Sequence, residues 1–239
     1  MKEMRDRMDK KYRHEYKYIC DGLQNAVLKV RAKGLLRPDS HAGHEGFYDI
    51  RSLYFDTPDN QCYLENEAGC DRRDKYRIRI YNADSRKIVL EKKSKERQMT
   101  LKVSCQISEE ICRKLMNNGR VQIQEDMPAL QKKLLSEMQT KAMRPVVIVE
   151  YRRFPFVEKN GNVRITFDEN IRSSNDIQNF LEKRIITRPI LEKGQSIIEV
   201  KWDAFLLSYI KEHMQLETLQ WTSFSKYYLC RKYNTHGGI

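Results

Sequence analysis

Charged side chains recur two residues apart inside strand-like segments, and this spacing constrains the fold more than any other feature of the chain. Residues i and i+2 of a β-strand point to the same face, so each pair shares a face. If the apolar residues between them pack outward against helices, the charged faces can meet only inside a closed or nearly closed sheet. Seven segments carry the pattern: Glu15/Lys17, Arg77/Arg79, Glu91/Lys93, Lys102/Ser104, Tyr151/Arg153, Arg164/Thr166/Asp168 and Glu199/Lys201.

Alternation and the content of Ile, Val, Tyr and Phe predict eight strands. They fall near residues 11–20, 47–56, 72–82, 86–94, 99–107, 145–156, 162–169 and 195–203. Helical patterns lie between them, at 21–33, 108–118, 128–142, 176–184, 203–217 and 223–231. Eight strands are enough to close a small barrel. We therefore expect an α+β fold, an antiparallel eight-stranded β-barrel with helices packed outside.

Three helices carry more detailed predictions. The first should place its apolar stripe, which comprises Leu23, Ala26, Val27 and Val30, on one face. The helices at 108–118 and 203–217 should open at Ser108 and Asp203, which are good N-cap residues. The last residues, 235–239, should be frayed.

Two short turns predict which strands are neighbours. Residues 81–85 separate two strand-like runs, and residues 159–162 contain the Asn-Gly pair typical of a tight hairpin. Strands 72–82 and 86–94 should therefore pair antiparallel, as should strands 145–156 and 162–169. The first pairing brings Arg77 and Arg79 beside Glu91 and Lys93.

The charge balance predicts an anionic partner. The 239 residues contain 45 Lys and Arg against 33 Asp and Glu, a formal net charge of +12. Nucleotide, nucleic acid, polyphosphate and a membrane surface all satisfy that balance. Length and the absence of a linker favour one domain, residues 1–239, with a core of about 11–231.

The location is predicted from what the sequence lacks. No stretch has the roughly 18 apolar residues of a transmembrane segment, and the charged start is unlike a signal peptide. We expect a soluble, cytoplasmic protein whose six cysteines are reduced thiols, because they show no metal-site spacing. His41 and His44 lie in a polar loop and should be surface histidines.

An ordinary solvated sheet face is the alternative explanation for any single charged pair. Repetition argues against it, because the pairs are dominated by Arg and Lys, with a Glu-x-Lys spacing on three separate strands. The charged faces would then form a basic tunnel containing a few carboxylates. Such a tunnel suits a polyphosphate chain and its divalent metal.

Eight strings, in this order and spacing, resemble the VTC domain, the catalytic domain of the vacuolar transporter chaperone polyphosphate polymerases and of bacterial relatives. They are RHEYKYIC, IRSLYFDTPDN, KYRIRIY, LEKKSK, VEYRRF, NVRITFDENIR, IIEVKW and FSKYYLC. That domain belongs to the triphosphate tunnel metalloenzyme superfamily and is related to the CYTH group. The resemblance implies a triphosphate tunnel with a C-terminal helix at one mouth. The chain shows neither the regulatory N-terminal domain nor the transmembrane segment of eukaryotic members, so coupled translocation is not expected.

The resemblance also implies roles for individual residues. Glu199 is the implied metal ligand for Mn²⁺ or Mg²⁺, and Glu15 and Glu91 are further candidates whose alternative role is ion pairing with neighbouring basic residues. Phosphate binding and catalysis are implied for Lys17, Arg77, Arg79, Lys93, Arg153, Arg164 and Lys226, and substrate binding also for Tyr151 and Lys201. Arginine suits this task because it stays charged and binds phosphate oxygens in pairs.

The activity that the resemblance implies is transfer of the γ-phosphate of ATP to inorganic polyphosphate, with no covalent intermediate on the protein. Hydrolysis of inorganic or nucleoside triphosphate stays open, because Glu15 gives the first strand the Glu-x-Lys spacing of the CYTH phosphatases. A non-catalytic polyanion-binding module is a third possibility. Nucleic acid is not expected as a partner, since no helix-turn-helix or zinc pattern is present and a tunnel would exclude a duplex. The sequence does not indicate a protein partner.

Overall fold

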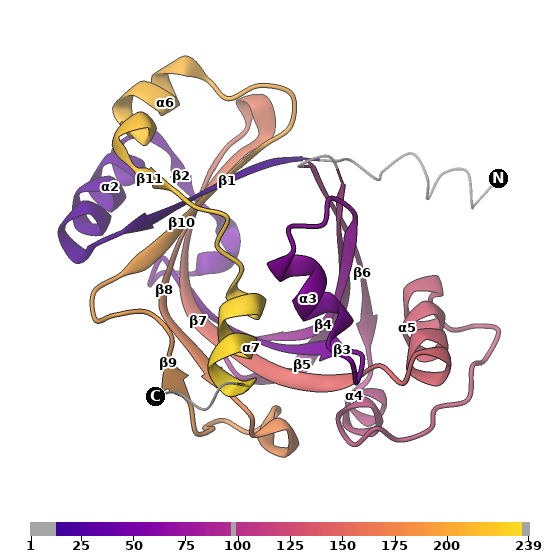
Figure 1. Cartoon of the computed structure of the whole chain (residues 1–239). Helices are drawn as coiled ribbons and strands as arrows, with labels where there is room; N and C mark the ends of the chain where they lie inside the picture. The colour runs from indigo at the N-terminus through magenta and orange to yellow at the C-terminus, as the bar shows by residue number, and fades with distance from the viewer. Residues whose placement is uncertain (1–12, 97–98, 236–239) are drawn as a thin grey trace.

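The computed structural model describes residues 13–96 and 99–235, and these form one antiparallel sheet that curls around a hollow (Figure 1). The hydrogen-bonded order is β11-β1-β10-β8-β7-β3-β4-β5-β6, while β2 pairs with β7 and β9 pairs with β8. The long strands are β1 (His14–Cys20), β3 (Tyr48–Asp56), β4 (Arg73–Tyr81), β5 (Asp84–Glu96), β6 (Met99–Ile107), β7 (Arg144–Glu158), β8 (Val163–Ser174) and β10 (Ser196–Trp202). The two-residue strands are β2 (Arg37–Pro38), β9 (Arg188–Pro189) and β11 (Gln220–Trp221).

All eight predicted strands are present, but the prediction of a closed eight-stranded barrel is wrong. The sheet has eleven strands and stays open between β1 and β6. In the described part of the chain, these two strands share one isolated bridge, between Arg13 and Thr100. On this side β11 pairs with the edge of β1 at Tyr18 and Ile19, so that part of the edge is not available to β6.

Both predicted hairpins are confirmed. β4 pairs antiparallel with β5, and the turn between them holds Asn82 and Ala83 at positive φ, as the twist of a tight hairpin requires. β7 pairs antiparallel with β8 through the short 3₁₀ turn η2 (Asn160–Asn162), in which Gly161 takes a φ of 70°. These pairings fix the register of the charged faces.

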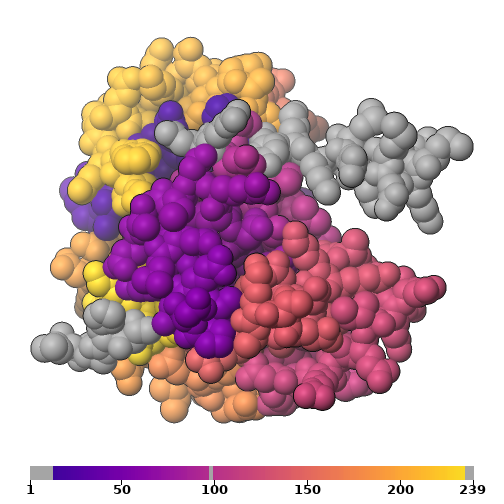
Figure 2. All heavy atoms as spheres, turned by 45° about the vertical axis from the view of Figure 1, so that its right-hand side comes forward, coloured from indigo at the N-terminus to yellow at the C-terminus, as the bar shows by residue number. Residues whose placement is uncertain are grey.

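The helices lie on both sides of the sheet. Most pack outside, as expected, whereas one helix that the sequence did not predict and the C-terminal helix, which the resemblance places at one mouth of the tunnel, lie on the concave side. On the outer face lie α2 (Gly22–Leu35), α4 (Glu109–Met116), α5 (Ala129–Thr140) and α6 (Ser208–His213), together with η4 (Leu216–Thr218). On the concave face lie α3 (Gln61–Glu67) and α7 (Lys226–Thr235) (Figure 1). The space-filling view shows the segment around α3 between the C-terminal part and α5 (Figure 2). The 3₁₀ turns η1 (Ser40–Ala42) and η3 (Ile177–Asn179) complete the elements.

The rotation of α2 differs from the prediction. Leu23 and Val30 of the expected stripe are 77% and 71% exposed, whereas Leu28 and Ala32 are buried. The cause is polar, because the Asn25 amide donates to Glu169 and the Lys29 ammonium pairs with the same carboxylate at 2.5 Å. These contacts turn the face that carries Asn25, Leu28 and Ala32 toward the sheet.

Two further helix predictions fail. In one segment a side chain hydrogen-bonds to the backbone carbonyls, and in the other the expected N-cap residue binds different partners. Residues 176–184 contain only η3. The buried Arg51 guanidinium donates to the backbone carbonyls of Phe180, Glu182 and Lys183, and these carbonyls are therefore engaged outside a regular helix. The helix expected from Asp203 begins at Ser208 instead. Asp203 pairs with Arg13 at 2.9 Å and accepts from the Asn162 amide, so it does not act as an N-cap. By contrast, Ser108 caps α4 as predicted.

The remaining expectations concern membrane-spanning segments, the cysteines, the histidines and the C-terminal residues. None of the helices in residues 13–96 and 99–235 has the length and apolarity needed to cross a membrane. The six cysteines, all within these ranges, form no disulfide. His41 pairs with Asp39 at 2.8 Å and keeps most of its ring exposed. The predicted fraying of 235–239 falls mostly on residues 236–239, which lie outside the described ranges.

Candidate functional site

A cavity of about 940 Å³ lies on the concave side of the sheet. Its wall is formed by β1, β3, β4, β5, β6, β7, β10 and β11 together with α3, the segment after it, and α7 with the segment before it. Among the described residues, the Lys and Arg side chains that line it are Lys17, Arg73, Lys75, Arg77, Arg79, Lys93, Lys95, Arg153, Lys201 and Lys226, and the acidic ones are Glu15, Asp71 and Glu199. A cavity with this balance favours a polyanionic ligand.

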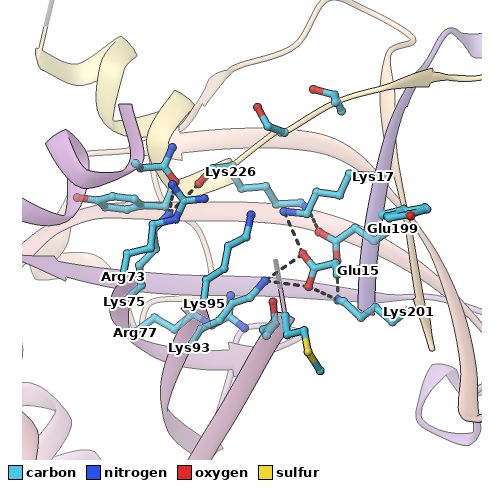
Figure 3. A pocket seen from close by; sticks show the side chains of 18 of the residues that line it. Glu15, Lys17, Arg73, Lys75, Arg77, Lys93, Lys95, Glu199, Lys201 and Lys226 are labelled. Atoms are coloured by element: carbon cyan, nitrogen blue, oxygen red, sulfur yellow. Dashed lines mark hydrogen bonds and ion pairs between the residues drawn. The ribbon is translucent and has the colours of Figure 1, made fainter. Parts of the chain in front are cut away.

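The cavity brings together ten of the twelve residues to which the sequence assigned a role in binding substrate, in catalysis or in binding metal; Glu91 and Arg164 are the exceptions. Nine of these residues come from strands, and Lys226 comes from the first turn of α7. The register between β1 and β10 brings the two glutamates together with lysines. Lys17 lies opposite Glu199, and Lys201 lies opposite Glu15. Figure 3 shows both carboxylates pointing among the lysines.

Glu199 is the centre of one ion-pair network. Its carboxylate contacts the ammonium groups of Lys226 at 2.6 Å and Lys201 at 2.7 Å, and the guanidinium of Arg153 at 3.3 Å. Burial alone would raise the pKa of Glu199, but the charges of these three residues hold the pKa well below its usual range. The side chain is therefore an anion, available to a cation or to basic residues.

Asp168 supports this network from behind. The carboxylate is 0% exposed, accepts two hydrogen bonds of 2.6 Å from Arg153, and contacts Lys226 at 2.6 Å. Burial by itself would lower the pKa of Lys226, but Asp168 and Glu199 raise it above the usual value for lysine. Arg153 and Lys226 are thus fixed as cations in the cavity wall.

Glu15 organises the lysines of the neighbouring strands. It contacts Lys93 at 2.9 Å, Lys17 at 3.1 Å and Lys201 at 3.9 Å. Burial would raise the pKa of Glu15, but the lysines, Lys93 first, outweigh burial and lower it well below the usual range. Glu15 therefore keeps several cations together in the absence of an anionic ligand.

Glu91 lies behind the arginines of β4. The carboxylate is 1% exposed and contacts Arg77 at 2.6 Å, Arg79 at 3.6 Å and Lys102 at 3.1 Å. It is not part of the cavity wall. Burial would raise the pKa of Glu91, yet the three cations lower it. Of the two roles that the sequence left open for Glu91, this geometry favours ion pairing.

Arg164 is, besides Glu91, the other predicted site residue that the structure does not bring to the cavity wall. Its guanidinium contacts the Asp39 carboxylate at 2.9 Å and donates to the Tyr48 hydroxyl at 2.9 Å. Its position on β8, opposite Lys201, is nevertheless on the face that the strands present to the hollow. The contacts with Asp39 and Tyr48, from distant parts of the chain, direct the side chain away.

Arg73, Lys75 and Lys95 line the cavity and were missed by the sequence reasoning. The signal was present, because alternation continues from Arg77 back to Lys75 and Arg73, and from Lys93 on to Lys95. The resemblance assigned roles to Arg77, Arg79 and Lys93 but to none of these three residues. Counting every second residue along the whole strand finds all three.

The described residues of this wall suit a divalent cation whose ligand set is completed by phosphate oxygens. No group of three or more His, Cys, Asp or Glu side chains converges within residues 13–96 and 99–235. Glu15 and Glu199, however, lie on neighbouring strands, and each affects the charge state of the other. Two carboxylates completed by phosphate oxygens and water are a normal ligand set for Mg²⁺ or Mn²⁺ at a phosphate. The donor set therefore suits a cation that arrives with its anion.

The affinity for triphosphate is expected to fall as the pH rises through about 8. Burial and the neighbouring cations lower the pKa of Lys93 to about 8, against the opposing effect of Glu15. Above that pH Lys93 loses the charge that attracts phosphate, whereas below it the charge is present. Calorimetric titration with inorganic triphosphate at pH 7 and pH 9, without metal, measures the difference. Lys93→Arg stays charged at both values, so equal pH dependence in that variant would contradict the assignment to Lys93.

The sequence matches a known family of proteins, and the fold is similar to those of solved structures. The sequence model of the VTC domain matches residues 12–234. The fold is similar to that of a candidate adenylyl cyclase from Hippeastrum, described as having a dominant triphosphatase activity, with a TM-score of 0.53, 13% identity, and coverage of 95% of this chain and 96% of that one. It is also similar to a candidate adenylate cyclase from Bacillus halodurans, with a TM-score of 0.50, 16% identity, and coverage of 87% and 88%. At these identities the likeness shows the fold alone. No curated protein matches the sequence.

Proposed function

Because this chain belongs to the VTC domain family, we propose that it is a metal-dependent polyphosphate polymerase. It transfers the γ-phosphate of ATP to a growing inorganic polyphosphate chain, and its place is the cytoplasm, where ATP is available and cysteines stay reduced. The predicted resemblance is confirmed by the family match, while the activity itself is the proposal.

The observation that carries the proposal is a row of four cations along β4. Arg73, Lys75, Arg77 and Arg79 occupy every second position, and all four line the cavity. Six residue steps of a strand span roughly 20 Å, at about 3.4 Å per residue. This row is longer than a triphosphate, so a longer chain of phosphates is the ligand that engages all of it.

The side chains suit phosphoryl transfer by positioning and charge neutralisation. Arg77, Arg79 and Arg153 remain charged and line the cavity, so each places a fixed positive charge beside the oxygens of a phosphate chain. The reaction needs the acceptor phosphate to lie in line with the γ-phosphorus, and most of the barrier is lowered by that alignment and by fixed positive charge. We therefore assign no nucleophile and no general base on the protein.

Glu15 and Glu199 are the residues that would hold a divalent cation. When bound, the cation supplies further neutralisation of charge on the transferred phosphoryl group. Each carboxylate would then exchange part of its contact with lysine for the cation, and the released ammonium groups of Lys93, Lys201 and Lys226 could bind phosphate oxygens. The ion-pair network thus prepares the wall for an anion and a metal together.

A triphosphatase is the second candidate, and one observation favours it. Two carboxylates face the same cavity, so one could hold the cation while the other orients a water molecule. The likeness to the Hippeastrum protein is compatible with this activity as well. A binding module without catalysis is the third candidate, and it would be indifferent to Glu199→Ala.

Purified protein incubated with ATP and Mn²⁺ distinguishes the three. Products are separated on a polyacrylamide gel stained for polyphosphate, while ADP and free phosphate are quantified in parallel. A ladder with ADP and little free phosphate is the expected result. Free phosphate without a ladder would replace the polymerase by a triphosphatase, and neither product in the presence of added polyphosphate primer would leave the binding module.

A further inference from the structure

We propose that Arg73, Lys75 and Lys95 form a subsite of their own, which holds the part of a polyphosphate chain that lies away from the reacting phosphate. The inference rests on the proposed function and adds to it the place at which the inorganic chain, rather than the nucleotide, is bound. The resemblance assigned no role to any of the three residues, although Lys75 and Lys95 lie within the strings KYRIRIY and LEKKSK.

The first observation is the cross-strand register. On β4 and β5, Arg73 lies directly opposite Lys95, and Lys75 lies directly opposite Lys93. Like charges directly opposite each other destabilise a sheet. Two such pairs in succession therefore cost stability, and an anionic ligand would remove that cost.

The second observation is the segregation of charge inside the cavity. Glu15 and Glu199 lie with Lys17 and Lys201 on one side, and Arg73 and Lys75 lie on the other (Figure 3). Asp71 also lines the cavity, and its charge affects the pKa of Lys95 less than the charges of Arg73 and Lys17 do. Across the described ranges, no carboxylate comes within ion-pair distance of Lys75; its ammonium donates to Asn66 at 2.6 Å and to Ser225 at 3.1 Å. Neutral oxygens orient this cation without neutralising it.

The electrostatic surroundings agree with the register. Burial, followed by the charges of Lys17, Arg73 and Lys93, lowers the pKa of Lys75 well below its usual range. Burial, Arg73 and Lys17 lower the pKa of Lys95 in the same way. Each lysine would regain its charge fully when an anion binds beside it.

The shape of this part of the cavity selects the class of ligand. Cations from two adjacent strands face each other, and Met99 and Thr100 close the wall beside them. Successive cations of one strand are about 7 Å apart, and a linear polyphosphate can place charge beside each of them because every unit is anionic. An inorganic polyphosphate chain with no base or sugar is therefore the ligand that fits.

The test compares two ligands on matched variants. Lys75→Met, Lys95→Met and the double variant remove the charge and keep an apolar stem, and Lys87→Met removes an exposed lysine of β5 outside the cavity as the control. Calorimetry without metal measures the affinity for long-chain polyphosphate and for inorganic triphosphate. We expect the double variant to lose at least tenfold in affinity for the long chain and less than twofold for triphosphate, with Lys87→Met unchanged for both.

Two outcomes would overturn the subsite. Equal losses for the two ligands would place these lysines in the triphosphate site itself, and unchanged affinities would remove them from ligand binding. Because like charges are removed, the variants should melt at the same or a higher temperature than the unsubstituted protein, which separates a binding defect from misfolding. The proposed function is tested apart from this: absence of a polyphosphate ladder with the unsubstituted protein would refute the polymerase, whereas the binding comparison reports on the subsite alone.

Discussion

Arg77→Ala is expected to abolish tight binding of triphosphate and to destabilise the fold as well. The guanidinium is the closest partner of Glu91, which is 1% exposed, so the variant leaves a buried carboxylate with Arg79 at 3.6 Å and Lys102 at 3.1 Å. Breaking a buried pair by removing one partner costs roughly 3 kcal/mol or more. For a chain of this size that corresponds to a fall of about 10 °C in melting temperature.

The double variant Arg77→Met with Glu91→Gln separates the two effects. Neither a buried charge nor its partner is then present, so most of the melting temperature should return, while the affinity for triphosphate should stay at least tenfold weaker, as expected from losing one charge-assisted contact of about 1.5–3 kcal/mol. Differential scanning fluorimetry and calorimetric titration measure the two quantities. Arg113→Ala, which removes an exposed partner of Glu109 on α4, is the control and should change neither. Recovery of triphosphate affinity in the double variant would refute a direct role for Arg77.

Glu199→Gln is expected to reduce turnover by about a hundredfold, the size of effect seen when one preorganised charge-stabilising group is removed. The affinity for metal-free triphosphate should be unchanged or tighter, because the variant removes a negative charge and frees Lys201, Lys226 and Arg153 from their shared partner. Turnover should therefore fall without any loss of affinity for metal-free triphosphate.

The measurement combines steady-state kinetics over a range of Mn²⁺ concentrations with calorimetry of triphosphate in a chelating buffer. Glu110→Gln, which removes an exposed carboxylate of α4, serves as the matched control and should change neither parameter. Unchanged turnover in Glu199→Gln would move the cation to Glu15, and the corresponding variant Glu15→Gln tests that directly. Loss of metal-free affinity would instead show that Glu199 matters through the positions of its basic neighbours.

Much of the cavity wall was predictable from strand periodicity. Arg77 and Arg79, or Glu91 and Lys93, share a face because side chains of a strand alternate with a period of two, and this geometry is local. The hairpin turns at 81–85 and 159–162 were equally local, and they fixed two of the strand pairings. The same count, extended along β4 and β5, would have found Arg73, Lys75 and Lys95.

The sequence by itself therefore determined the eight long strands, the faces on which their charges lie, and the membership of the VTC domain family. The tertiary structure decided what depends on contacts between distant residues. The contacts of Asn25 and Lys29 with Glu169 set the rotation of α2, and those of Arg51 replaced a predicted helix by an irregular segment. Asp39 directed Arg164 away from the cavity, and β11 paired with part of the edge of β1, which is thus not available to β6. Such outcomes have no periodic signature, because each depends on which of several possible partners a side chain or a strand edge meets when the chain folds.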